Sequence, residues 1–241
     1  MGRSNLSNLV GSIRIKKLSR TNPGIAHLIG QVRRDKLTYL DLPALIDLYQ
    51  VIAQIESDHR DGIIIEAGCA LGGSAIVIAG SKNPNRNFYL YDVFGTIPAP
   101  SDQDGVDARE RYEVISSGKS EGINGERYYG YQDDLFEKVI VNFEKLGFPI
   151  DKNCIYLKKG LFQDTLIVDE PVAFAHIDAD WFESVMVCLE RITPYLVTGG
   201  VLVIDDYYHW SGARKAVDDY FEGRDNEFHF NRKSRLRVVK K

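Results

Sequence analysis

The sequence predicts an α/β fold in which helices cover both faces of a parallel sheet. Short apolar runs recur along the chain, and segments with helical periodicity separate them. Runs without polar alternation are typical of strands that are buried on both faces, as in parallel sheets. The 241 residues suffice for one such domain with additions, and a chain of this size buries a core without disulfides or a structural metal.

The N-terminal segment is the least regular part of the sequence. Residues 1–40 are polar and contain Asn22-Pro23-Gly24, so we expect a loosely ordered arm or cap. Alternatively, this arm contacts an anionic partner or joins copies of the chain into a homo-oligomer. Apolar residues then recur at steps of three and four from Leu42, which predicts a helix that ends near Ser57. Residues 1–60 are therefore expected to form an arm and a cap helix.

The main domain is expected over residues 61–241. Buried strands are predicted at 62–66, 88–92, 154–157, 172–177 and 200–204. Helical patterns lie between them and after the last, at 74–79, 133–146, 182–192 and 213–221. The segments 227–230 and 236–239 flank four polar residues and predict a terminal hairpin.

A long insertion, at about 96–131, follows the second strand. It is rich in Gly, Ser, Asp and Tyr, with a short helical pattern at 108–115. A loop of this length inside a compact domain is usually a lid or a disordered insertion. Ligands of open α/β sheets bind outside the carboxyl ends of the strands, where this insertion begins. Its position favours a lid.

Charge and cysteine content exclude several classes of protein. The chain has 30 Lys+Arg against 34 Asp+Glu, whereas proteins that bind nucleic acid need clustered basic residues. Cys69, Cys154 and Cys188 form no CxxC pair, so we expect reduced thiols. No run of 18 apolar residues and no signal-peptide pattern is present. We therefore expect no nucleic-acid partner, no membrane span and a cytoplasmic location.

A glycine-rich turn follows the first strand, in the sequence Glu66-Ala67-Gly68-Cys69-Ala70-Leu71-Gly72-Gly73-Ser74. Such a turn lets the backbone approach a ligand, and the next helix offers free N–H groups. A dinucleotide pattern would need Gly at Ala70 to make room for a pyrophosphate, and Glu66 would repel a phosphate. S-Adenosylmethionine fits better, with Asp92 after the second strand accepting hydrogen bonds from ribose hydroxyls. The alternatives are a turn without a ligand and, for Asp92, a helix N-cap.

Aspartates follow two further strands. Asp178 and Asp180 come after the fourth strand, and Asp205 and Asp206 after the fifth. Carboxylates that meet at one edge of a sheet repel each other unless a cation neutralises them. Oxygen ligands favour a hard ion such as Mg²⁺, or otherwise Mn²⁺ or Ca²⁺.

The aspartate pattern alone leaves other functions open. The DxD pattern occurs in glycosyltransferases, and phosphohydrolases use similar acids, so it gains specificity only from Asp205-Asp206 and the glycine turn. Of the two nearby histidines, we expect His176 to be a core residue and His209 to lie in a pocket.

Together these segments resemble the macrocin O-methyltransferase family. Members of this family are metal-dependent enzymes that use S-adenosylmethionine to methylate sugar hydroxyls in macrolide and aminocoumarin biosynthesis. The resemblance spans roughly residues 36–220, without the insertion at 99–131 and the first 35 residues. The matching segments are 65–68, 72–74, 91–98, 159–166, 177–184 and 199–207.

The resemblance implies a fold and a set of site residues. The fold would be that of class I S-adenosylmethionine-dependent methyltransferases, a Rossmann-like sheet of seven strands with the last one antiparallel. Asp180 would be the general base, and Mg²⁺ would be bound by Asp178, Asp205 and Asp206. The cofactor would be bound by Glu66, Gly68, Gly72, Ser74, Asp92, Phe162, Gln163 and Asp178.

The expected reaction is transfer of a methyl group to a sugar hydroxyl of a glycosylated metabolite, a nucleotide sugar or a polysaccharide. Two alternatives remain at this point. An NAD-dependent nucleotide-sugar oxidoreductase would explain the glycine turn and Asp92 but would leave the four aspartates without a role. A non-catalytic ligand-binding domain of the same fold would not need a complete set of metal ligands and base.

Overall fold

The computed structural model describes the backbone of residues 2–241 and the side chains from Val10 onward. Seven strands form one sheet, as predicted for a class I methyltransferase fold, and their order in the sheet is β3-β2-β1-β4-β5-β7-β6. β1 to β5 are parallel, and β7 lies antiparallel between β5 and β6. The strands are β1 Ile63–Ala67, β2 Phe88–Asp92, β3 Ile155–Lys159, β4 Val172–Ile177, β5 Leu196–Ile204, β6 Phe228–Arg232 and β7 Leu236–Lys240.

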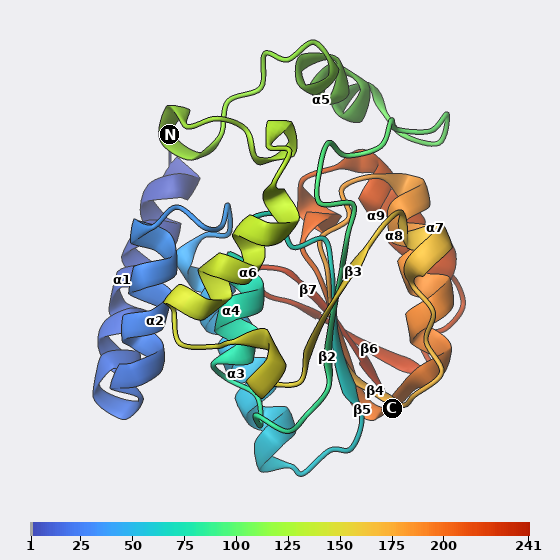
Figure 1. Cartoon of the computed structure of the whole chain (residues 1–241). Helices are drawn as coiled ribbons and strands as arrows, with labels where there is room; N and C mark the ends of the chain where they lie inside the picture. The colour runs from blue at the N-terminus through green and yellow to red at the C-terminus, as the bar shows by residue number, and fades with distance from the viewer. Residues whose placement is uncertain (1) are drawn as a thin grey trace.

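Helices cover both faces of this sheet, as the sequence predicts (Figure 1). On one face lie α3 Leu42–Ser57, α4 Gly73–Ala79 and α6 Leu135–Lys145, with α1 Gly2–Thr21 and α2 Pro23–Arg34 outside them. On the other face lie α7 Phe162–Thr165, α8 Phe182–Ile192 and α9 Ser211–Phe221. Within the described residues, none of the helices is both long and apolar enough to cross a bilayer.

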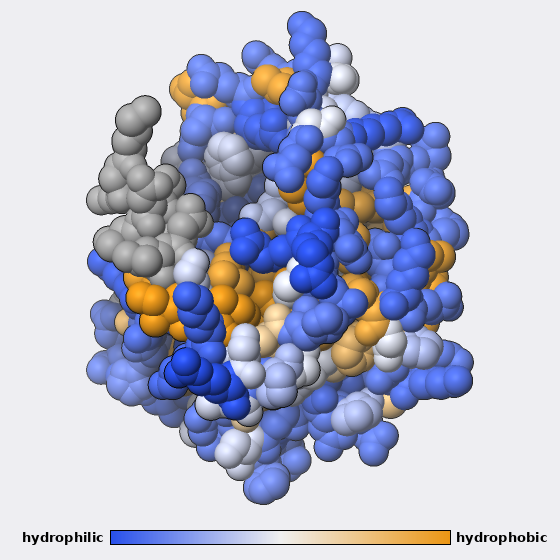
Figure 2. Space-filling model, turned by 90° about the vertical axis from the view of Figure 1, so that its left-hand side faces the viewer, coloured by the Kyte–Doolittle hydropathy of each residue, from blue (hydrophilic) through white to orange (hydrophobic). Residues whose placement is uncertain are grey.

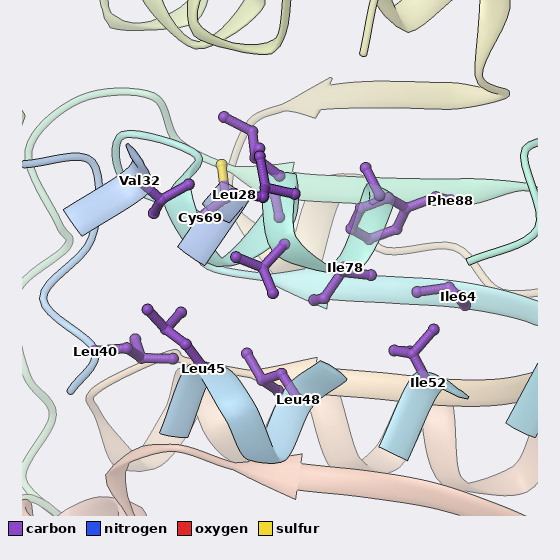
Figure 3. Packing of buried hydrophobic residues seen from close by; sticks show 14 of the residues in the cluster. Leu28, Val32, Leu40, Leu45, Leu48, Ile52, Ile64, Cys69, Ile78 and Phe88 are labelled. Atoms are coloured by element: carbon purple, nitrogen blue, oxygen red, sulfur yellow. The ribbon is translucent and has the colours of Figure 1, made fainter. Parts of the chain in front are cut away.

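The central strands β1, β4 and β5 supply residues to two cores, because successive side chains of a strand point to opposite faces. Ile64 packs in the core with α2, α3 and α4, whereas its neighbours Ile63 and Ile65 pack in the core with α8 and α9. Figure 3 shows Leu45, Leu48 and Ile52 of α3 packed toward β1 and α4. Burying one such side chain contributes about 1.5–3 kcal/mol, so these contacts hold the strand ends in a fixed register.

Residues 1–40, expected to form a loosely ordered arm or cap, are not loosely ordered where the structure describes them, because α1 and α2 are helices. Asn22 caps α2 by accepting a hydrogen bond from the Ile25 N–H (3.2 Å), and Pro23 occupies the first helical turn. The tripeptide that suggested a break is thus a helix start signal. The buried residues of α2 are Ile25, Ala26, Leu28, Ile29 and Val32. Met1 lies outside the described residues.

The outer helices form the face shown in Figure 2, where apolar side chains gather in the middle of a mostly polar surface. Val10 and Ile13 of α1 are 44% and 62% exposed. A role of this segment in joining copies of the chain stays a prediction.

The insertion is folded and lies beyond the carboxyl ends of the strands, at the top of Figure 1. It contains α5 Val106–Ser116 and two single turns of 3₁₀-helix, Ile123–Gly125 and Tyr129–Tyr131. Asp104 accepts a hydrogen bond from the first N–H of α8, at Phe182 (2.8 Å), and Asp107 accepts two from Ser211 at the start of α9 (2.6 and 2.8 Å). The residues that precede these helices provide no side-chain cap of their own. Acids of the insertion therefore cap both helices.

Removing these caps is expected to loosen the insertion. Asp104 is 3% exposed, and its carboxylate accepts a hydrogen bond from the N-terminus of α8. Asp104→Ala removes this cap, which should lower the free energy of unfolding by about 1 kcal/mol. The variant should also be cleaved faster by proteases within residues 96–131. Asp102→Ala is the matched control, because this neighbouring residue is exposed and, among the residues with described side chains, its carbonyl alone makes a hydrogen bond. Equal cleavage rates in the two variants would contradict the capping role.

Candidate active site

A cavity of about 370 Å³ opens where the strands end beneath the insertion. Its walls come from the glycine turn after β1, from Asp92 at the end of β2, and from the segments that follow β3, β4 and β5. Ile97, Pro98, Arg111 and Tyr128 of the insertion also line it, and a role of the insertion as a lid stays a prediction. Residues far apart in the sequence thus enclose one volume, in which two small molecules could meet.

The structure brings the four aspartates together in this cavity. Asp178, Asp180, Asp205 and Asp206 all line it. β4 and β5 are parallel neighbours with Ile177 opposite Ile204, so the residues that follow both strands emerge at the same height. The Asp180 N–H donates to Asp206 Oδ2 at 3.0 Å, which joins the two segments.

Burial and like charges disturb the titration of three of these acids. Burial, together with the charges of Asp205 and Asp206, raises the pKa of Asp178 well above its ordinary value. Burial and the neighbouring Asp180 and Asp205 have the same effect on the pKa of Asp206. Burial also raises the pKa of Asp180 to about 6, although a hydrogen bond from Trp210 acts in the opposite direction and lowers this pKa. A cation at this cluster would favour the ionised forms.

Asp205 is the exception, because two cations lie beside it. Burial favours its neutral form, but the neighbouring His176 and the charge of Arg235 outweigh burial and lower the pKa of Asp205. His176 is fully buried, and its Nδ1 lies 2.7 Å from Glu66 Oε1 while its Nε2 lies 3.8 Å from Asp205 Oδ1. Burial opposes protonation of His176, yet these two acids raise its pKa to about 9. The predicted core histidine is buried. It hydrogen-bonds to Glu66, and its Nε2 faces Asp205 without a hydrogen bond among the described residues.

Three predicted cofactor residues do not reach the cavity. The structure places Glu66, Gly72 and Ser74 in buried positions outside its lining. The Glu66 side chain faces His176 of the neighbouring strand, which is its cross-strand partner in the sheet. Its second oxygen, Oε2, has no hydrogen-bond partner among the described residues. In this structure the Glu66 side chain therefore contacts His176 and does not line the cavity.

The turn glycines are required by contacts within the chain. A Cβ at Gly68, whose φ is +86°, would lie 1.8 Å from the Asp178 carbonyl oxygen. A Cβ at Gly73 would lie 2.4 Å from the carbonyl oxygen of Leu37, which accepts the Gly73 N–H at 2.9 Å. These two glycines are therefore required because other backbone segments pack closely against them. Binding of a phosphate is not needed to explain their presence. Gly68 itself does line the cavity.

Asp92 joins the first two strand ends. Its Oδ2 accepts hydrogen bonds from the N–H groups of Cys69 (2.8 Å) and Ala70 (3.1 Å), and its Oδ1 accepts one from Phe94 (2.7 Å). The Cys69 side chain also forms a hydrogen bond with this carboxylate, so Asp92 is held mainly by the chain itself. Asp92, Phe162 and Gln163 line the cavity, and their expected contacts with a ribose and an adenine stay a prediction.

The residues that the structure groups as possible metal ligands differ in one member from the predicted set. Among the described residues, Asp205, Asp206 and His209 can bring one ligand atom each within 4.8 Å of one another. Asp178 lies outside this group, but it lines the same cavity, and the charge of Asp206 contributes to the raised pKa of Asp178. Carboxylate oxygens dominate the donor set, which suits a hard divalent cation.

Several cavity residues escaped the sequence analysis. Trp181 and Trp210 line the cavity and pack edge to face, with ring centroids 5.4 Å apart. Arg111 of α5 lies over the Tyr128 ring (5.7 Å), and Arg235 of the hairpin pairs with Asp205. Trp181 could have been found from the sequence, because it follows Asp180 directly. The other residues are distant from the predicted site residues or carry no motif, and the tertiary structure alone brings them to the cavity.

The sequence matches the profile of one protein family over residues 36–227, and that family is described as macrocin-O-methyltransferase. A curated relative from Streptomyces olivaceus, 8-demethyl-8-(2,3-dimethoxy-alpha-L-rhamnosyl)-tetracenomycin-C 4'-O-methyltransferase, is 28% identical over 84% of this chain and 70% of its own length. Demethyldecarbamoylnovobiocin O-methyltransferase from Streptomyces niveus is 25% identical over 76% of this chain and 67% of its own length.

Solved structures agree with the fold. The structure of the O-methyltransferase NovP superposes with a TM-score of 0.70 at 21% identity and covers 98% of each chain. The match extends over the N-terminal helices as well as the sheet.

Proposed function

Because the chain belongs to the macrocin-O-methyltransferase family and is an O-methyltransferase, we propose that it methylates a sugar hydroxyl with S-adenosylmethionine and Mg²⁺. The observation that carries this proposal is the placement of Asp178, Asp180, Asp205 and Asp206 around one end of a cavity that also contains Asp92. A nicotinamide enzyme has no use for this set of acids.

The residues fit both groups. The acids around Asp206 have raised pKa values because like charges are buried together, which is the situation that a divalent cation relieves. Gly68, Asp92, Phe162 and Gln163 would hold the nucleoside, and Asp205, Asp206 and His209 or Asp178 the metal. When bound, S-adenosylmethionine supplies an electrophilic methyl group and Mg²⁺ lowers the pKa of the acceptor hydroxyl.

Asp180 is the residue best placed to remove the hydroxyl proton. Its carboxylate lines the cavity beside the metal-site acids, and burial raises its pKa to about 6, which favours proton acceptance near neutral pH. The left-handed backbone at Asp180 (φ +57°) costs on the order of 1 kcal/mol. Such strain is typical of residues whose side chain must point in one direction.

The acceptor class follows from the relatives and from the cavity wall. One curated relative is named for 4'-O-methylation of a rhamnosyl-tetracenomycin. On the insertion side, the cavity presents the rings of Tyr128 and Tyr129, together with Tyr39. Such apolar faces with polar edges suit the ring of a sugar. We therefore propose a glycoside or a nucleotide sugar as acceptor.

Thermal unfolding with candidate ligands tests the cofactor assignment. S-Adenosylmethionine and S-adenosylhomocysteine at about 100 times their Kd should stabilise the protein by about 2.7 kcal/mol, and Mg²⁺ should add to this. NAD is the control, and a shift with NAD alone would contradict the proposal. Mass spectrometry of reactions with a glycoside panel, including p-nitrophenyl α-L-rhamnoside and dTDP-L-rhamnose, then identifies the acceptor.

A further inference from the structure

We propose that Trp210 is a positioning residue that orients the Asp180 carboxylate through its indole N–H. The Trp210 Nε1 donates a hydrogen bond to Asp180 Oδ1 at 3.0 Å. This inference rests on the proposed role of Asp180 as the base, and it adds a residue that neither the sequence pattern nor the family comparison assigns.

The hydrogen bond leaves one oxygen of the base available. Among the residues with described side chains, no donor lies within hydrogen-bond distance of Asp180 Oδ2. The backbone of Asp180 is held separately, because its N–H donates to Asp206 Oδ2 at 3.0 Å. Trp210 therefore fixes the rotation of the side chain while the other oxygen remains free to accept a proton.

Trp210 is itself fixed from three directions. Its backbone N–H donates to the Asp206 carbonyl oxygen at 3.0 Å. Its ring packs edge to face on Trp181, at an interplanar angle of 64°. The residue after it, Ser211, is held by Asp107 of the insertion. An indole anchored in this way can orient a carboxylate with little loss of side-chain entropy.

Trp181 offers a matched comparison within the same site. Its Nε1 also donates a hydrogen bond, at 2.9 Å, but to the Pro98 carbonyl oxygen of the insertion. The two indoles touch each other and line the same cavity. Replacing either with Phe removes one N–H and keeps an aromatic ring, yet only Trp210→Phe releases the carboxylate.

Steady-state kinetics of these variants test the proposal. The acceptor in these assays is the glycoside of the panel that the wild type methylates fastest. A hydrogen bond to a charged group corresponds to about tenfold or more in rate, so Trp210→Phe should lower kcat by at least about tenfold with KM for S-adenosylmethionine unchanged. Trp181→Phe should mainly raise KM for the acceptor, because it loosens the insertion. Equal losses of kcat in the two variants, or an unchanged kcat in Trp210→Phe, would overturn the proposal.

A spectroscopic test is independent of the acceptor. The chain has two tryptophans, so ¹H–¹⁵N spectra contain two indole signals, which the two Phe variants assign. In Asp180→Ala the Trp210 signal should move and exchange faster with solvent, whereas the Trp181 signal should stay close to its wild-type position. Unmoved Trp210 resonances would refute the contact. If instead Asp180→Asn keeps full activity, the proposed base fails, and this outcome is distinguishable from a failure of Trp210.

Discussion

Asp180→Asn is expected to lower kcat by about 10²–10⁴-fold, the usual contribution of a general base. The amide keeps the size of the side chain and can still accept the hydrogen bond from Trp210, so the local geometry should persist. It cannot take up a proton from the acceptor hydroxyl at neutral pH. The Kd for S-adenosylhomocysteine, measured by thermal unfolding or calorimetry, should therefore stay near the wild-type value while turnover is lost.

Glu183→Gln is the matched control for this variant. Glu183 is exposed in the first turn of α8, close to Asp180 in sequence but outside the cavity lining. The same loss of one negative charge should leave kcat within about twofold, because exposed charges interact weakly with the site. Near-wild-type turnover in Asp180→Asn would remove this residue as the base and leave water or another acid to take the proton.

The sheet and its main helices could be predicted because their sequence signals are local and strong. The observed bounds of α3, Leu42–Ser57, and α8, Phe182–Ile192, coincide with the predicted ones, since apolar residues at steps of three and four mark the buried face over several turns. α2 was missed although Ile25, Leu28, Ile29 and Val32 follow the same spacing. Pro23 and Gly24 at the start of α2 suggested a break in the chain, and the periodic pattern that follows them is short.

The site could be predicted only to the extent that strand ends determine it. Asp178 and Asp205 come together because parallel strands end at one edge, a rule that needs no coordinates. The direction of Glu66 depends on which face of β1 its side chain occupies and on its cross-strand partner, His176. A shift of one residue along the strand would reverse that direction. The contact between Trp210 and Asp180 depends on a turn and a helix start, and no sequence spacing encodes it.

His176→Gln is expected to lower the free energy of unfolding by about 3 kcal/mol below pH 6.5, because removing one partner of a buried ion pair leaves the other charge uncompensated. Glu66 and His176 are fully buried, and their side chains are 2.7 Å apart. Glutamine can retain a hydrogen bond to Glu66 but not the positive charge. For a chain of this length, such a loss corresponds to a decrease in Tm of roughly 6–12 °C.

The difference in unfolding free energy between the wild type and His176→Gln should depend on pH, and this dependence separates the effect of the His176 charge from the effect of its packing. Neighbouring Glu66 and Asp205 raise the pKa of His176 from 6.5 to about 9 against the effect of burial. The folded state therefore binds a proton that the unfolded state releases between these values. The stability that this proton provides is complete below pH 6.5 and is lost as the pH rises through about 9. The difference between wild type and His176→Gln should narrow over this range, whereas the exposed His229→Gln should show little difference at any pH. A difference that stays constant from pH 6 to 9.5 would show that packing, and not the buried imidazolium, explains the loss.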